Sequence, residues 1–284
     1  MPQNLTIIGL GLLGGSIGLA VKDRIRGCKI MGCAHREGSL KDALALGAID
    51  SWTLDPAEAV READFVVLCM PVSMIGTWIW KIAGHLKAGA VVTDVGSTKA
   101  AICYAGEAIQ RPAHFVGSHP MAGSEKKGVA VARADLFDGA TCIVTPTSRT
   151  DLGAADTVAA FWQTLGCRVV RHDPETHDRL VSLVSHLPHA VAAAVVAVQS
   201  DASLDLRGKG FLDSTRVAAG DAELWRDIFT DNRDNVVIAI DRLIAELATL
   251  SRTLRSNDPA ALQQWLAQAA RVRTSLDPRN ADRQ

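Results

Sequence analysis

The sequence has few aromatic residues, no paired cysteines and almost no net charge. Only 5% of its 284 residues are Phe, Trp or Tyr, and 30 Lys and Arg stand against 31 Asp and Glu. Duplex nucleic acid needs a concentrated positive face and single strands need stacking aromatics, so these absences argue against a nucleic-acid partner. The six cysteines stand singly without a CxxC pair, which argues against a dithiol centre and a zinc site. We expect no metal.

The sequence also lacks targeting and membrane-spanning signals. The first residues lead directly into a strand pattern at residue 5, without a basic stretch followed by a cleavable apolar one. The longest strongly apolar run, residues 190–198, is shorter than the roughly 20 residues that cross a bilayer. Unpaired cysteines are typical of a reducing compartment. These features predict a cytoplasmic protein that does not bind membranes.

The first 173 residues alternate short apolar runs with longer amphipathic segments. Strands covered by helices on both faces are apolar almost throughout, and alternation of strand with helix is typical of a largely parallel, doubly wound sheet. The expected strands are residues 5–8, 29–33, 65–69, 90–94, 115–117, 142–145 and 168–170. The expected helices between them are residues 14–21, 39–46, 72–85, 98–110 and 151–165. The fold class is therefore α/β, with a Rossmann-type sheet at the N-terminus.

The remaining residues, 174–284, contain only helical patterns and predict a second, all-α domain. The expected helices are residues 175–184, 189–199, 224–251 and 259–275. Residues 190–198 are alanine and valine on every face, and such a helix must be buried in a bundle or between subunits. A domain of this size has little room to bury that helix alone. We therefore expect a homodimer formed through the helical domain, which would also hold the substrate.

A glycine-rich motif, GLGLLG at residues 9–14, lies between the first strand and the first helix. In this position the first glycine permits a tight turn, the second lets the backbone approach a pyrophosphate, and the third allows close packing of helix on strand. The helix N-terminus then offers unpaired N–H groups to the phosphates. The motif predicts that a dinucleotide is bound at Gly9, Gly11, Leu12, Leu13 and Gly14.

The end of the second strand indicates which dinucleotide is preferred. An NAD site usually has Asp or Glu here to bind the ribose hydroxyls, whereas this chain has Ala34, His35 and Arg36. A guanidinium can pair with a 2′-phosphate that a carboxylate would repel. The alternative is that Arg36 is a solvated loop residue that binds no cofactor. The pattern favours NADP, with NAD possible, and His35 and Arg36 as binding residues.

Three longer motifs carry a family resemblance. They are DVGSTK at residues 94–99, GSHPMAGSE at residues 117–125, and GFLDSTR at residues 210–216 followed by WRD at residues 225–227. Their content, order and spacing resemble the prephenate/arogenate dehydrogenase family of tyrosine biosynthesis over nearly the whole chain. The resemblance implies a nicotinamide-dependent dehydrogenase that oxidatively decarboxylates prephenate, arogenate or both, without a metal.

The same resemblance implies roles for individual residues. His119 matches the catalytic histidine that accepts the substrate hydroxyl proton, and Ser97 matches a serine between this histidine and the nicotinamide. Arg216 matches an arginine that binds a substrate carboxylate, and His189 a pocket residue near a carboxylate. Ser124 and Glu125 are further substrate-binding candidates. From the residues alone, His119 could be structural, Ser97 could cap a helix, Glu125 could cap one as well, and Arg216 could form a surface salt bridge.

Two other functions compete with this interpretation. β-Hydroxyacid dehydrogenases and related imine reductases also join a Rossmann domain to a helical one, and commonly rely on a lysine in the helical domain. Here Lys209 is the only lysine after residue 174, with no motif around it. A non-catalytic NADP-sensing protein would have no need of His119, Ser97 and Arg216 together. His186 and His189 have a spacing that metal ligands use, but no third ligand accompanies them.

Overall fold

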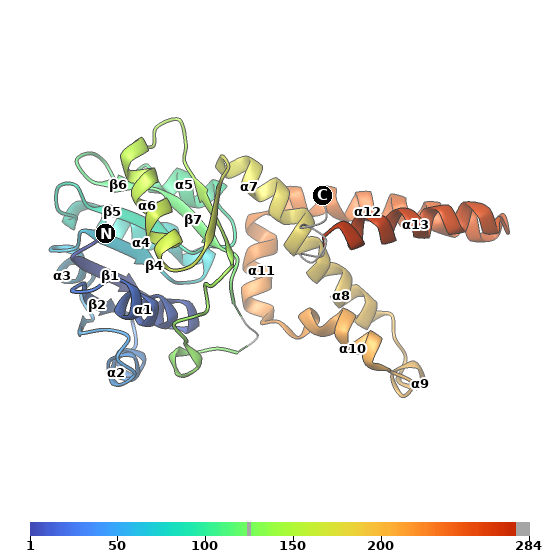
Figure 1. The fold of residues 1–284 in the computed structure, drawn as a ribbon, viewed down its shortest axis with the longest axis horizontal. Coiled ribbons are helices and arrows are strands. Elements are labelled where there is room, and N and C mark those ends of the chain that lie inside the picture. Colours follow the sequence, from blue (N-terminus) through green and yellow to red (C-terminus); the bar gives the residue numbers. More distant parts are fainter. Residues whose placement is uncertain (124–125, 277–284) are drawn as a thin grey trace. The chain divides into compact units, whose positions relative to one another are not determined.

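The computed structural model describes residues 1–123 and 126–276 (Figure 1). Contacts divide the chain into a larger unit, Met1–Arg233, and a smaller one, Asp234–Gln284. The strands end before residue 174, where the sequence predicted a domain boundary. The helices that follow, up to Arg233, nevertheless belong by their contacts to the larger unit.

The larger unit contains a six-stranded parallel sheet in the order β3-β2-β1-β4-β5-β6. Its strands are β1 (Asn4–Ile8), β2 (Lys29–Cys33), β3 (Ser51–Thr53), β4 (Phe65–Leu68), β5 (Val91–Asp94) and β6 (His114–Phe115). This is the order of a dinucleotide-binding Rossmann sheet, and the order reverses between β1 and β4. The predicted fold class is confirmed, although the short strand β3 was not predicted.

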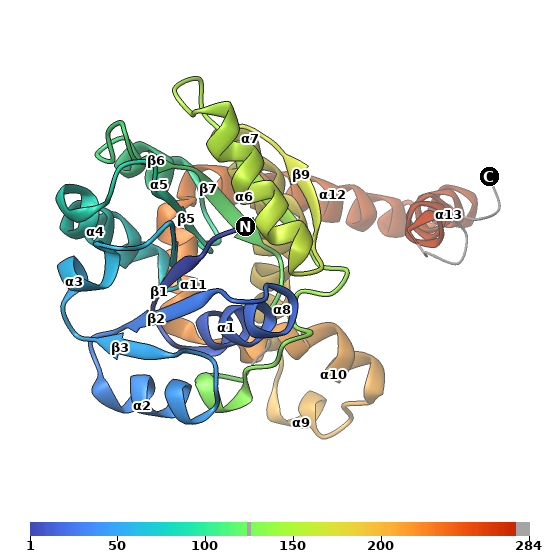
Figure 2. The ribbon, with the colours of Figure 1, turned by 60° about the vertical axis from the view of Figure 1, so that its left-hand side comes forward.

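Helices cover both faces of this sheet (Figure 2). One buried apolar cluster joins the sheet to α1 (Leu12–Arg24), α2 (Glu37–Ala45) and α6 (Leu152–Thr164). A second cluster joins the other face to α3 (Pro56–Val60), α4 (Val72–Ile82) and α5 (Ala100–Gly106). Because both faces are covered, the central strands are apolar throughout, which is why the sequence revealed them so clearly.

A second, three-stranded sheet was not predicted as a separate sheet. It has the order β7-β8-β9, with β7 (Gly117–Pro120) antiparallel to β8 (Thr141–Thr145), and β8 parallel to β9 (Arg168–Arg171). The single strand predicted over residues 115–117 is wrong, because the chain leaves β6 at the buried Val116 and enters β7. At Gly117 a Cβ atom would lie 2.4 Å from Oγ1 of Thr145, so a close approach of β7 to β8 requires glycine.

After β9 the chain forms one long helical stretch, from Pro174 to Ala197. It consists of α7 (Pro174–Val181), a π-helical turn over Ser182–His186, and α8 (Leu187–Ala197). Pro188 has no N–H, and its ring crowds the carbonyl of Val184, so the regular ladder is broken here. The N–H of Leu187 instead reaches the carbonyl of Ser182, five residues back. By length and composition alone this stretch could cross a membrane, a test that core helices also pass.

Three shorter helices complete the larger unit: α9 (Asp201–Leu204), α10 (Lys209–Thr215) and α11 (Ala222–Asp231). The single helix predicted over residues 224–251 is in fact two, because the chain departs from helical geometry at Asn232, where φ is −105° and ψ is 28°. The smaller unit has α13 (Pro259–Ser275) and all of α12 (Arg233–Arg255) except its first residue. Between them Asn257 adopts a positive φ of 50°, and the Asp258 side chain accepts hydrogen bonds from the first N–H groups of α13.

Candidate active site

The glycine motif forms a tight turn at the N-terminus of α1. Gly9 has a φ of 99°, and a Cβ atom there would lie 2.1 Å from the carbonyl oxygen of Cys69. By contrast, a Cβ at Gly11 would meet no atom within 4 Å, which leaves the backbone open to a ligand. No side chain caps α1 and no acid lies in its first turn. The first N–H groups of α1 and the positive end of its dipole therefore suit a pyrophosphate.

The loop after β2 presents the two residues predicted to bind the adenosine end. His35 and Arg36 are both exposed, and the Arg36 guanidinium donates to the His35 ring over 3.1 Å. The nearest following acid, Glu37, is the first residue of α2 and pairs with Lys41 at 2.9 Å. Within the described residues Arg36 has no carboxylate partner, so its charge is available to an anion.

A buried ion pair anchors the loop that carries Ser97. Asp94, at the end of β5, pairs with Lys99, and neither side chain is exposed to solvent. The Asp94 carboxylate also accepts from the backbone N–H groups of Gly96, at 2.8 Å, and Ser118, at 3.1 Å. One carboxylate therefore fixes both the Ser97 loop and the start of β7. Breaking such a buried pair leaves an uncompensated charge, which is costly.

Ser97 is half-buried, and its alternative role as a helix cap is wrong. The predicted helix over residues 98–110 is shorter, since α5 begins at Ala100, with Lys99 rather than Ser97 at the N-cap position. The cap comes from a distant residue, because the Asp178 carboxylate accepts from the N–H groups of Lys99, at 2.7 Å, and Ala100, at 2.9 Å. The Ser97 hydroxyl consequently has no role in starting α5.

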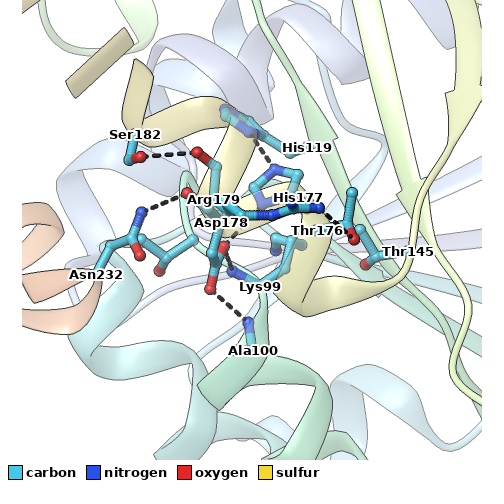
Figure 3. Close-up of polar contacts among 12 residues, drawn as sticks. Lys99, Ala100, His119, Thr145, Thr176, His177, Asp178, Arg179, Ser182 and Asn232 are labelled. Atoms are coloured by element: carbon cyan, nitrogen blue, oxygen red, sulfur yellow. Dashed lines mark hydrogen bonds and ion pairs between the residues drawn. The ribbon is translucent and has the colours of Figure 1, made fainter. Parts of the chain in front are cut away.

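His119 lies in β7 and is 7% exposed. Its Nδ1 lies 2.9 Å from Nε2 of His177, and Nδ1 of His177 lies 2.8 Å from Oδ1 of Asp178 (Figure 3). Burial lowers the pKa of His119 well below its ordinary value, and the neighbouring His177, Lys99 and His186 lower it further. The site therefore holds a neutral imidazole near pH 7. No described residue hydrogen bonds to Nε2 of His119.

A second group of rings lies along the same helical stretch. His189 stacks on Trp225, with ring centroids 3.6 Å apart and planes 13° from parallel. His186 is fixed by Asn232, whose amide nitrogen lies 3.2 Å from Nδ1 of the ring and donates to the carbonyl of Asp178 over 2.8 Å. Burial lowers the pKa of His186 to about 4 and also lowers that of His189.

Two ring nitrogens in this group are buried without a partner, namely Nε2 of His186 and Nδ1 of His189. A buried polar atom without a hydrogen bond costs free energy, so such atoms mark places where a ligand or water completes the structure. The described residues contain no group of three His, Cys, Asp or Glu side chains arranged for a metal ion. A ligand or a water molecule that hydrogen bonds to these two nitrogens would complete this part of the structure.

Helix α11 connects the helical segment to the Rossmann sheet. The Ser73 hydroxyl of α4 donates to Asp227 over 2.6 Å, and the Thr98 hydroxyl donates to Asp231. Trp225 of the same helix stacks on His189, and a Cβ at Gly220 would lie 2.6 Å from the Trp225 ring nitrogen and 3.0 Å from the His189 ring. The WRD part of the third motif, at residues 225–227, therefore joins α4 to the ring of His189.

The remaining predicted residues lie at the edge of this site or outside the described residues. Arg216 begins the turn after α10. Its side chain is exposed and has no ion pair among the described residues, which does not support the alternative role as a surface salt bridge. Ser124 and Glu125 lie outside the described residues. Just after them, Lys127 pairs with Asp221, the N-cap of α11, so that part of the loop reaches the helical segment.

Several residues of the site were not predicted from the sequence. They are Lys99, His177, Asp178 and Asn232, together with Phe229, which packs near Trp225. The pair His177-Asp178 had no distinguishing signal, because the residues on either side of it, Thr176 and Arg179, are polar as well. The sequence therefore does not tell which residues the pair contacts.

Comparison with known proteins agrees with these features. The family described as the nucleotide-binding domain of prephenate dehydrogenase matches residues 17–171, and that described as its dimerization domain matches residues 173–268. A prephenate dehydrogenase of Bacillus subtilis is 34% identical over 285 residues, which cover 97% of this chain and 76% of the relative. A cyclohexadienyl dehydrogenase of Zymomonas mobilis is 33% identical over 284 residues, which cover 96% of this chain and 96% of the relative.

Solved structures of similar proteins have the same fold. A prephenate dehydrogenase of Aquifex aeolicus, in complex with hydroxyphenyl propionate and NAD⁺, superposes with a TM-score of 0.90 and is 34% identical, covering 97% of this chain and 98% of that one. A Synechocystis arogenate dehydrogenase superposes with a TM-score of 0.84 at 28% identity, and the match covers 96% of this chain and 99% of that one. The resemblance read from the three motifs is thus confirmed, and the chain belongs to the prephenate dehydrogenase family.

Proposed function

We propose that this chain oxidatively decarboxylates prephenate, arogenate or both, with transfer of a hydride to a nicotinamide dinucleotide. The observation that carries the proposal is the buried, neutral imidazole of His119, hydrogen bonded at Nδ1 and without a described partner at Nε2. A glycine loop that fits a pyrophosphate belongs to the same unit. A positioned base and a bound hydride acceptor are what this reaction requires.

In the proposed reaction the substrate loses a hydride from the ring carbon that bears the hydroxyl, a proton from that hydroxyl, and its ring carboxylate as CO₂. The nicotinamide, when bound, supplies the hydride acceptor. His119 accepts the hydroxyl proton at Nε2, for which its lowered pKa keeps the ring unprotonated near pH 7. Ser97 orients His119 and the nicotinamide through its hydroxyl. The ring becomes aromatic, which drives the reaction.

The substrate is held by the helical segment. Arg216 binds a substrate carboxylate, since its exposed guanidinium has no competing ion pair among the described residues. His189 contributes its unpartnered Nδ1 to the same pocket while its face stacks on Trp225. Ser124 and Glu125 stay predictions for substrate binding.

The direct test is to incubate the purified chain with prephenate and with arogenate, each with NAD⁺ and with NADP⁺. Reduced cofactor is followed at the nicotinamide absorbance, together with release of one equivalent of CO₂. Reduction matched by CO₂ in at least one pair supports the proposal. Reduction without CO₂ would instead support a hydroxyacid dehydrogenase, and cofactor binding without turnover of either acid would support a sensing protein.

The pH dependence tests the state of His119. Because burial holds its pKa well below 6.5, the ring stays neutral as pH falls through that value. We expect kcat/KM to be constant from pH 8 to below pH 6.5, and to fall only when His119 is protonated at lower pH. Initial rates at subsaturating substrate from pH 4.5 to 8 measure this. An acid limb centred at or above pH 6.5 would contradict it.

For the cofactor we propose a preference for NADP over NAD, carried by Arg36. Replacing this residue by alanine removes the cation that would pair with a 2′-phosphate. We expect Arg36→Ala to raise KM for NADP⁺ about tenfold or more and KM for NAD⁺ less than twofold. Arg26, an exposed arginine just beyond the C-terminus of α1, gives the matched control Arg26→Ala. A wild type that is more efficient with NAD⁺ contradicts the proposal.

We also propose a cytoplasmic homodimer. Apolar side chains of the α7–α8 stretch are exposed in the single chain, Val184 at 67% and Val196 at 40%, and so is Leu247 of α12 at 52%. The burial that the sequence predicted for residues 190–198 is therefore not achieved within one chain. A two-fold contact would cover these surfaces.

Sedimentation should show a dimer at micromolar concentration, and a charge near the C-terminal end of α8 should weaken it. We expect Val196→Asp to shift the dimer dissociation constant at least tenfold, because a carboxylate would be buried without a partner. Leu152→Asp changes a residue that is even more exposed, at 74%, at the start of α6 on the Rossmann sheet, and it should leave the dimer intact. A monomeric wild type would rule the dimer out.

A further inference from the structure

We propose that His177 and Asp178 are positioning residues that fix the tautomer of His119 and so hold the lone pair of its Nε2 available for the substrate. This inference rests on the proposed function and extends it to two residues that contact no substrate. It is carried by a continuous line of hydrogen bonds from the N-terminus of α5 to His119 (Figure 3).

The line begins at Asp178, whose role is fixed by its neighbours. Oδ1 of this carboxylate accepts from the N–H of Lys99 and Oδ2 from the N–H of Ala100. A backbone N–H can only donate, so both carboxylate oxygens act as acceptors. The side chain is 5% exposed, and the carbonyl of the same residue accepts a hydrogen bond from Asn232. Asp178 therefore cannot turn to present a different atom.

The direction of the remaining hydrogen bonds follows. Because Oδ1 of Asp178 accepts, Nδ1 of His177 must carry the hydrogen that is donated over 2.8 Å. Burial lowers the pKa of His177, against the opposing effect of Asp178, so the ring is neutral and its Nε2 carries no hydrogen. Nε2 must then accept from Nδ1–H of His119 over 2.9 Å. The neutral His119 ring is thereby left with an unprotonated Nε2.

The alternative tautomer of His119 is unfavourable in this setting. It would place two unprotonated nitrogens, Nδ1 of His119 and Nε2 of His177, 2.9 Å apart in a site where His177 is fully buried. Neither could donate, and both would be buried without a hydrogen bond. The same line stabilises the protonated form of His119 after it takes the proton, since Nδ1–H then donates a charge-assisted bond.

The test uses two substitutions of His177 that differ in one property. His177→Phe keeps a ring of similar size but can neither accept nor donate. His177→Gln offers an amide oxygen to His119 and an amide N–H to Asp178, so it can keep the tautomer without being ionisable. Asp178 is left unchanged because it also caps α5. Ser182→Ala, which removes a different buried polar group of the same helical stretch, is the matched control.

The first readout is the tautomer of His119. It is measured by two-bond ¹H–¹⁵N correlation spectra of protein with ¹⁵N-labelled histidine, recorded without substrate. The signals of His119 are assigned as those that disappear in His119→Asn. We expect Nδ1–H in the wild type, Ser182→Ala and His177→Gln, and Nε2–H or a mixture in His177→Phe. This readout does not depend on which acid is turned over, so it separates failure of this inference from failure of the proposed function.

The second readout is steady-state kinetics. With the wrong tautomer, His177→Phe should lose about 10²-fold in kcat with KM changed less than threefold, while His177→Gln should recover at least tenfold of that loss. A wild type with His119 in the Nε2–H tautomer would overturn the inference. So would a folded His177→Phe variant with wild-type kcat, or a His177→Gln variant as impaired as His177→Phe.

Discussion

Replacing His119 by asparagine is expected to lower kcat by about 10²–10⁴-fold and to leave KM for prephenate or arogenate nearly unchanged. A general base contributes mainly in the transition state, so its loss appears in kcat rather than in substrate binding. The loss is expected at saturating substrate in steady-state assays, with either cofactor.

This prediction needs a measurement of protein stability as a control, because a loss of folding would also lower the rate. His119 is buried and hydrogen bonded to His177, so thermal midpoints must be measured beside the kinetic constants. His85→Asn, at an exposed histidine, should keep both wild-type values. A His119→Asn variant that folds and keeps the wild-type kcat at saturation would show that His119 is a structural residue and that the base lies elsewhere.

Replacing Arg216 by alanine is expected to act on KM instead. Its guanidinium would pair with a carboxylate that is present in both the substrate and the transition state, so its contribution is uniform binding. Charge-assisted hydrogen bonds contribute about 1.5–3 kcal/mol, which corresponds to a rise in KM of roughly 10- to 150-fold with kcat changed little. Initial rates over a wide range of substrate concentration measure both constants.

Arg216→Lys separates the charge from the geometry. A lysine keeps the positive charge but lacks the planar fork that binds a carboxylate through two parallel bonds, so its KM should lie between those of the wild type and the alanine variant. Arg207→Ala, at an exposed arginine nearby in the chain, is the control and should change neither constant. An Arg216→Ala variant that loses kcat with an unchanged KM would place this residue in the chemical step and not in substrate binding.

The sequence by itself determined the Rossmann architecture and the family. Periodicity and glycine placement are local, and they report a sheet covered on both faces and a phosphate turn at Gly9 regardless of the rest of the fold. Three motifs of six to nine residues identified the family because the functional residues of each motif lie close together in the sequence. His119 and Ser97 were found in this way, as members of motifs.

Tertiary structure decided which residues surround His119. His177 is 58 positions from His119, and Lys99 is the N-cap residue of a different element, α5, so no pattern in the sequence links them to His119. The N-terminus of α5 shows the same limit. Local chemistry offered Ser97 as its cap. The first N–H groups of α5 instead donate to the carboxylate of Asp178, which is 79 positions from Lys99. Hydrogen bonds between distant elements depend on how those elements pack, and packing is set by the summed burial of many apolar side chains, which short patterns do not contain.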